Sequence, residues 1–148
     1  VEIETFVEQV PIINRSNAAN KNIEIKYESK ILFPTIHTDL NYLHRILDNL
    51  ISNAIKFSPF GKQINISLSD SSEEIAICIK DEGPGFSEKD KTKVFQKFQK
   101  LSARPTNNEH SSGLGLSIVK ALVDRLKGTI ELISEQGKGS EFVVKLPR

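Results

Sequence analysis

The segment Asp39–Phe57, which reads DLNYLHRILDNLISNAIKF, provides the helical layer on which the rest of the chain can pack. Apolar residues recur in it every three or four positions, which predicts one buried stripe along a helix. The stripe consists of Leu40, Leu43, Ile46, Leu47, Leu50, Ile51 and Ala54. Asp39 stands where an N-cap accepts backbone N–H groups, and Pro59 and Gly61 favour an end soon after Phe57.

The same helix carries a polar stripe beside its apolar one. At 3.6 residues per turn, Asn53 lies about 40° around the axis from Asn49, and Lys56 lies about 20° on the other side. Asn is a mediocre helix former, and any single one is typical of a solvated face. Three polar groups on one stripe beside the core favour a polar site instead. Amide oxygens suit Mg²⁺, and a lysine one turn on can bind phosphate.

The remaining segments predict a sheet covered by helices. Residues 3–20 have helical spacing interrupted at Pro11, and residues 113–126 have a second helical stripe. Alternating apolar residues predict strands at 23–27, 63–70, 74–80, 129–134 and 140–146. We therefore expect one α+β domain over residues 1–148, a two-layer α/β sandwich with a mixed, mostly antiparallel sheet and about three helices.

Asp81-Glu82-Gly83-Pro84-Gly85-Phe86 follows directly after the strand predicted at residues 74–80. A carboxylate at the end of an interior strand can accept a hydrogen bond from an exocyclic amine such as that of adenine, a charge-assisted bond of roughly 1.5–3 kcal/mol. Glycines in the turn allow the backbone to approach a ligand closely. Taken alone, the segment is equally typical of a plain turn that ends a strand.

Two further glycine-containing segments lie toward the C-terminus. Ser112-Gly113-Leu114-Gly115-Leu116 opens a helix, where free N–H groups and the helix dipole attract anions. It follows the polar, aperiodic segment 99–112, which we interpret as a lid. Gly137 to Phe142 joins the last two predicted strands as a tight hairpin. Each of these segments has a purely structural explanation when it is considered by itself.

Composition excludes several classes of protein. The formal net charge of +1 argues against a nucleic-acid-binding protein, and no apolar run is long enough to span a membrane. The single cysteine, Cys78, allows no internal disulfide and favours a reducing, cytoplasmic compartment. The chain begins at Val1 and contains no Met, so we expect it to be part of a longer protein, and nothing in it indicates that it dimerises by itself.

In their order along the chain, these segments resemble the boxes of the catalytic, ATP-binding domain of sensor histidine kinases, within the Bergerat-fold ATPases and kinases. Residues 44–59 resemble the N box, and residues 94–98 the F box. Asp81 to Phe86, residues 113–120 and Gly137 to Phe142 resemble the three glycine boxes in turn. The resemblance covers residues 39–146, and a full set of boxes in this order is highly specific.

The resemblance implies that ATP and Mg²⁺ bind, and it assigns a role to each matching residue. In this assignment Asn53 binds Mg²⁺, Asn49 and Lys56 contact phosphates, and Asp81 bonds the adenine amine. Phe57, Gly83 and Gly85 shape the pocket, Phe98 anchors the lid, Gly113, Leu114, Gly115 and Leu116 line the phosphates, and Ser140 supports the adenine side. Lys100 stands where the family commonly has arginine, so it would meet a phosphate without a bidentate fork. Ser111 stands where the family often has glycine.

Within this fold, the resemblance favours a kinase over a hydrolase. Hydrolysing members have a Glu that orients water where this chain has Asn49, and an amide is no general base. They also tend to have Asp where this chain has Lys56. A degenerate nucleotide-binding module remains the third possibility.

The resemblance also implies partners outside this chain. His37, His44 and His110 are interpreted as ordinary residues, so the accepting histidine would lie on a separate dimerisation domain of a homodimeric parent. A response regulator would act downstream. Whether the parent is membrane-anchored stays open.

Overall fold

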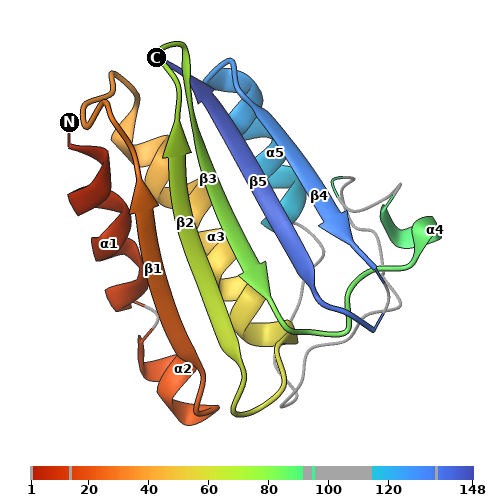
Figure 1. Ribbon diagram of the computed structural model, residues 1–148. Helices are drawn as coiled ribbons and strands as arrows, with labels where there is room; N and C mark the ends of the chain where they lie inside the picture. Colours follow the sequence, from red (N-terminus) through yellow and green to blue (C-terminus); the bar gives the residue numbers. More distant parts are fainter. Residues whose placement is uncertain (1, 14, 92–94, 96–114, 136) are drawn as a thin grey trace.

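The computed structural model describes residues 2–13, 15–91, 95, 115–135 and 137–148 (Figure 1). In chain order its elements are α1 (Ile3–Ile13), α2 (Arg15–Asn20), β1 (Glu24–Lys30), α3 (Leu40–Phe57), β2 (Gln63–Asp70), β3 (Glu74–Asp81), α4 (Glu88–Lys91), α5 (Gly115–Arg125), β4 (Thr129–Ser134) and β5 (Ser140–Pro147). The described residues form one five-stranded sheet, with α3 and α5 behind it in the view of Figure 1. The predicted α+β sandwich is therefore confirmed.

The strands lie in the order β1-β2-β3-β5-β4. β1 pairs with β2 in parallel, whereas the β2–β3, β3–β5 and β4–β5 pairs are antiparallel. The sheet is thus mixed and mostly antiparallel, as expected. β3 is the central strand, which explains why its sequence is apolar at Ile75, Ile77 and Ile79. The strand ends at the buried residue Asp81.

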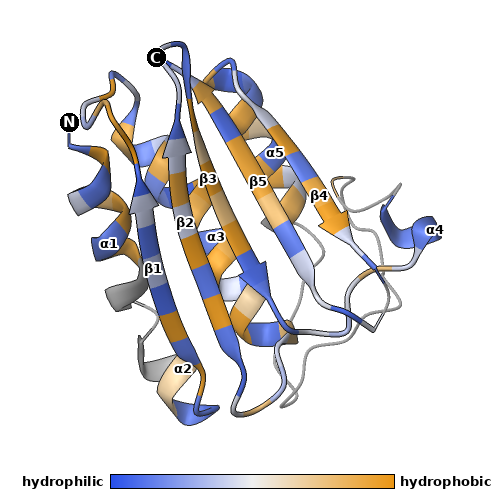
Figure 2. Cartoon of the chain, viewed as in Figure 1, coloured by the Kyte–Doolittle hydropathy of each residue, from blue (hydrophilic) through white to orange (hydrophobic). Residues whose placement is uncertain are grey.

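α3 is the central helix, and its predicted stripe forms much of the core. The side-chain oxygen Oδ1 of Asp39 accepts hydrogen bonds from the N–H groups of Asn41 at 2.9 Å and Tyr42 at 3.2 Å, as an N-cap does. The buried residues of the helix are Leu43, Ile46, Leu47, Leu50, Ile51, Ala54 and Ile55. Apolar residues alternate with polar ones along β2, whereas longer apolar runs occur in β4 and β5 (Figure 2).

The structure differs from the sequence prediction at three places. The first strand starts at Glu24 and continues to Lys30, because parallel pairing with β2 extends it beyond its apolar residues. The helix that contains Pro11 ends at Ile13, and α2 begins at Arg15. The four-residue α4 was not predicted, since it is too short for a periodic pattern. The predicted lid, residues 99–112, lies outside the described residues.

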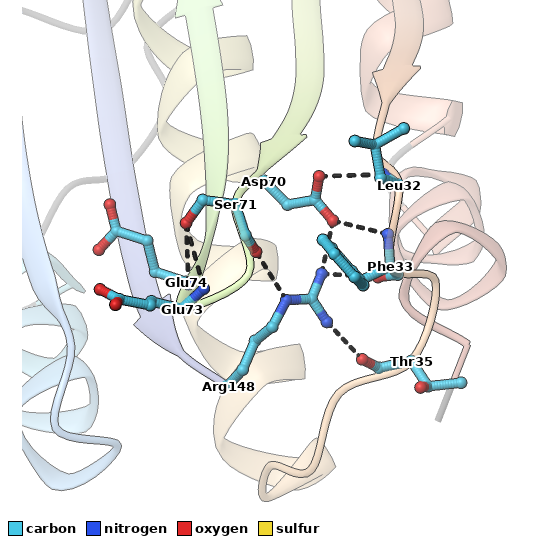
Figure 3. A network of polar contacts seen from close by, with 8 residues as sticks. All are labelled: Leu32, Phe33, Thr35, Asp70, Ser71, Glu73, Glu74 and Arg148. Carbon is cyan, nitrogen blue, oxygen red and sulfur yellow. Dashed lines mark hydrogen bonds and ion pairs between the residues drawn. The ribbon is translucent and has the colours of Figure 1, made fainter.

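A polar network ties the C-terminal residue to the loop that follows β1 (Figure 3). The Arg148 guanidinium donates to the Asp70 carboxylate at 2.5 Å and to the carbonyl oxygens of Phe33 and Thr35, both at 2.6 Å. Asp70 also accepts the N–H groups of Leu32 and Phe33 at 3.0 and 2.9 Å. Burial alone would raise the pKa of Asp70, but these N–H groups and the guanidinium outweigh it and hold the pKa below its ordinary value.

Arg148→Ala is expected to lower the stability of the domain at neutral pH, because it removes the counter-ion of a buried carboxylate. Since the pKa of Asp70 is depressed in the folded state, the ionised carboxylate stabilises the fold above its unfolded pKa, and this contribution is lost as the pH falls through the folded pKa. Denaturant unfolding at pH 7 and at acidic pH should therefore show a stability difference between the two proteins that shrinks on acidification. A difference independent of pH would contradict this account.

Candidate functional site

A pocket of about 320 Å³ of empty space, open to solvent, lies where β3 ends and β5 begins. In Figure 1 this end of the sheet is opposite the two chain termini. The C-terminal half of α3 and the first turn of α5 close the pocket on the helical side. Its lining residues are Asn53, Ala54, Phe57, Asp81, Pro84, Gly85, Phe86, Leu116, Ser140 and Phe142. Six of the residues expected at the site, contributed by four different segments, therefore meet in one pocket.

Asp81, the last residue of β3, is 4% exposed. Its Oδ1 accepts the N–H of Gly83 at 2.8 Å, and its Oδ2 accepts the hydroxyl of Ser140 at 2.8 Å. Burial raises the pKa of the Asp81 carboxyl, although the donors at Gly83 and Ser140 oppose this effect. A carboxylate with lone pairs to spare beside an apolar pocket can accept one more hydrogen bond, from a ligand that brings its own donor.

The turn that follows Asp81 is braced by the hairpin between β4 and β5. The N–H of Gly137 donates to the carbonyl of Pro84 at 2.6 Å. The hydroxyl of Ser134 accepts the N–H of Phe86 at 2.8 Å and donates to the carbonyl of Gly139 at 3.0 Å. The hairpin therefore holds this turn in place, and no sequence pattern predicts the contacts of Ser134.

Gly85 is required by this packing as well as by its own backbone conformation. Its φ is +71°, and a Cβ there would lie 2.4 Å from the carbonyl oxygen of Glu135. A Cβ on Gly83 would likewise lie 2.7 Å from the carbonyl oxygen of Phe57. The missing side chains thus allow close contact within the protein. Gly85 also lines the pocket, whereas Gly83 is not among its lining residues.

Gly85→Ala is expected to destabilise the domain by about 3 kcal/mol, because the positive φ and the contact with a backbone carbonyl both disfavour a side chain. Gly137→Ala is the matched control. Gly137 also has a positive φ, of +87°, but a Cβ added there would meet no described atom within 4 Å. That variant should lose only about 1 kcal/mol. Equal losses in urea unfolding of the two variants would show that the hairpin contact contributes nothing.

The polar stripe of α3 is present, but its members differ in position. Asn53 and Phe57 line the pocket, whereas Asn49 and Lys56 are half-buried on α3 and are not among its lining residues. The side-chain amide of Asn49 donates to the carbonyl of Arg45 at 2.9 Å, within the helix. The side-chain oxygen of Asn49 takes no part in this hydrogen bond. Gly115 is the first residue of α5, and Leu116 in the same turn reaches the pocket.

The predicted site residues and the residues that line the pocket are not the same set. Phe98, Lys100, Gly113 and Leu114 lie outside the described residues. Phe86 and Phe142 were not assigned to the site, yet their ring centroids lie 6.3 Å apart, and Phe57 lies 6.4 Å from Phe86. Strand period could have identified Phe142, because it stands two residues after Ser140 and so shares its face of the sheet.

The side chains that line the pocket suit the adenine base of a nucleotide. Aromatic and aliphatic walls suit a flat base, and the buried Asp81 carboxylate is the acceptor that an exocyclic amine requires. No group of three or more His, Cys, Asp or Glu side chains that could hold a metal ion occurs among the described residues. Among the described residues that line the pocket, Asn53 is the one with a side-chain amide, whose oxygen would suit Mg²⁺ that takes its other ligands from phosphates and water.

The chain is similar to proteins of a known family. The family described as histidine kinase-, DNA gyrase B- and HSP90-like ATPases matches residues 38–148. Histidine kinase P4 of Formosa agariphila is 34% identical over 145 residues, which cover 96% of this chain and 11% of that protein. The chain thus spans about a tenth of the length of this relative. Among the described residues no helix has both the length and the apolar character to cross a bilayer.

Two solved structures have a fold similar to that of this chain. Full-length ShkA, solved in complex with AMPPNP, has a TM-score of 0.87 and 29% identity, and the match covers 99% of this chain and 30% of that one. The histidine kinase ThkA, solved with the response regulator TrrA, has a TM-score of 0.82 at 22% identity, over 99% of this chain and 40% of that one, which shows the shared fold. The chain belongs to the family of histidine kinase-, DNA gyrase B- and HSP90-like ATPases, and it is an ATP-binding domain of the histidine kinase type.

Proposed function

We propose that this domain binds ATP with Mg²⁺ and transfers the γ-phosphoryl group to a histidine on a separate dimerisation domain. The observation that carries the proposal is the buried Asp81 carboxylate, held by Gly83 and Ser140 at the edge of an aromatic pocket. The exocyclic amine of adenine can donate a hydrogen bond to this carboxylate. The rings of Phe57 and Phe86 supply apolar walls for the base. Sequence and fold therefore support the same ligand.

The triphosphate would extend from the adenine pocket along α3. Asn53 lies on this path, and its amide oxygen would bind Mg²⁺, which supplies charge neutralisation to the phosphates when bound. Asn49 and Lys56 lie on the same face of the helix and would contact the phosphates. The predicted contributions of Phe98, Lys100, Gly113 and Leu114 to the lid and phosphate site remain part of this proposal.

The identity of residue 49 favours transfer to a protein over hydrolysis. Hydrolysis needs a group that orients and deprotonates water, and the amide of Asn49 donates to Arg45 and has no basic nitrogen. In the proposed transfer, the bond between the γ-phosphorus and the bridging oxygen breaks to release ADP, and a bond from phosphorus to an imidazole nitrogen forms. The protein's contribution is to position the reactants and exclude water.

The partners follow from the same proposal. The acceptor histidine would lie on the dimerisation domain of a homodimeric parent, and the phosphoryl group would pass from it to a response regulator. ThkA, which shares this fold, was solved with a response regulator, which supports the second step. We place the domain in the cytoplasm, where ATP and response regulators occur.

The test is a reconstituted transfer reaction. The domain is mixed with a separate polypeptide that carries the parent's dimerisation domain, in γ-labelled ATP and Mg²⁺. We expect label on the dimerisation domain in an acid-labile, base-stable form, and none when the acceptor histidine of that polypeptide is replaced by glutamine. Rapid release of phosphate by the domain alone would indicate a hydrolase, and no binding of ATP at millimolar Mg²⁺ would indicate a degenerate module.

A further inference from the structure

Lys21 is a lysine in the turn after α2 whose side chain is almost fully buried, with 1% of the residue exposed. Its Nζ donates to the carbonyl oxygens of Ile55 at 2.7 Å and Lys56 at 3.1 Å, both in the last turn of α3. We propose that Lys21 is a positioning residue for the nucleotide site, which it serves by capping the end of α3 from outside the helix. This inference rests on the proposed function, since it assigns Lys21 a task in nucleotide binding.

The end of α3 needs such a cap, because the last carbonyl groups of a helix have no partner within it. Here the N–H of Ser58 donates to the carbonyl of Ala54 at 3.0 Å, and Lys21 takes the next two carbonyls in sequence. A cationic group at a helix C-terminus also interacts favourably with the helix dipole. Lys21 thus does for this helix what a capping residue normally does, but from a position 34 residues away.

The capped turn is the part of α3 that meets the pocket. The ring of Phe57 lines the pocket, and its carbonyl oxygen packs so closely on Gly83 that a Cβ there would lie 2.7 Å away. The N–H of Gly83 in turn donates to Asp81 at 2.8 Å. A shift of the last turn of α3 would therefore move both a wall of the pocket and the turn that holds the Asp81 carboxylate.

Lys21 is itself held at several points, as a positioning residue must be. Its N–H donates to the carbonyl of Ala18 at 3.1 Å, and its carbonyl accepts the N–H of Gly61 at 2.9 Å. Its Nζ lies 5.7 Å from the centroid of the Phe60 ring, within range of a cation–π contact. Lys21 therefore links the end of α2 to the last turn of α3 and to the loop that follows α3.

The experiment separates positioning from general stability. Lys21→Met keeps the length of the side chain but removes the donor, and we expect it to weaken ATP binding by about tenfold, since small displacements in a site reduce binding and rate strongly. Val7→Ala is the stability control: Val7 is fully buried in α1, does not line the pocket, and should destabilise the domain without changing ATP affinity. Lys62→Met controls for loss of an exposed lysine.

Titration calorimetry on the whole chain, well below the unfolding temperature of every variant, gives the affinities. The amide resonance of Gly83 should shift in Lys21→Met and stay in place in Val7→Ala, which a purely structural role would not produce. Wild-type affinity in a folded Lys21→Met, or equal weakening in Val7→Ala, would overturn the proposal. Failure of the wild-type chain to bind ATP is a separate result that overturns the proposed function and this inference with it.

Discussion

Asp81→Asn is expected to weaken ATP binding by about 10- to 100-fold, which corresponds to the loss of one charge-assisted hydrogen bond. The substitution should leave the fold intact, because the amide oxygen of Asn can accept the N–H of Gly83 and its NH₂ can donate to the hydroxyl of Ser140. In Asn, an NH₂ group replaces the second carboxylate oxygen, so the acceptor that this oxygen could provide for the adenine amine is lost. Titration calorimetry with ATP and Mg²⁺ measures the effect directly.

GTP supplies the control for this variant. Guanine has a carbonyl where adenine has its amine, so the introduced NH₂ group can donate to it, and the preference of the wild-type domain for ATP over GTP should shrink or disappear. Unchanged ATP affinity in Asp81→Asn would place the base elsewhere in the molecule. Equal losses for both nucleotides would indicate damage to the pocket instead of a lost hydrogen bond.

The pH dependence of the same carboxylate gives a second readout. Because burial raises the pKa of Asp81, protonation should begin to weaken ATP binding at a higher pH than for an ordinary aspartate, and Asp81→Asn should flatten that part of the profile. A raised pKa in the folded state favours the neutral carboxyl, so the empty domain loses stability as the pH rises through that pKa. The uncharged Asn should therefore make the empty domain more stable at pH 7.

The sequence predicted the features that have a repeating pattern. A sandwich follows directly from the helical period of α3, the N-cap at Asp39 and the alternation of β3. Asn53 and Asp81 then lie at the end of the sandwich that carries the pocket. The full length of β1 was not predictable, because pairing with β2 determines it, and its outer residues show no apolar pattern. Local patterns identify elements, whereas partners from other elements determine where they end.

Contacts between residues far apart in the sequence could not be predicted either. Lys21 resembles any exposed lysine in the sequence, and only the folded chain brings its Nζ to the end of α3. Ser134 likewise occupies an ordinary strand position, yet it bonds both to Phe86 and to Gly139. Gly85 was expected near the ligand, and the structure adds a second requirement, contact with the carbonyl of Glu135. Such residues have no spacing signature, because each depends on a single long-range partner.

Asn53→Ala is expected to remove most of the Mg²⁺-dependent part of ATP binding and to lower phosphoryl transfer by about 100-fold or more. Asn53 is the amide that α3 contributes to the pocket, so its loss removes a ligand from the proposed metal site and leaves in place the Phe57 and Phe86 rings and the Asp81 carboxylate proposed to hold the base. Affinity for ATP measured in Mg²⁺ should fall toward the value measured in EDTA, while affinity for adenosine should stay unchanged.

Asn41→Ala is the matched control for that variant, because Asn41 carries the same side chain on the same helix but is exposed near its start, far from the pocket. It should bind and transfer as the wild-type domain does. If Asn53→Ala kept its full response to Mg²⁺, the metal would have to be held by other residues, and α3 would then serve the base alone. If adenosine binding fell together with ATP binding, Asn53 would be a wall of the base pocket, and the phosphates would have to leave it by another path.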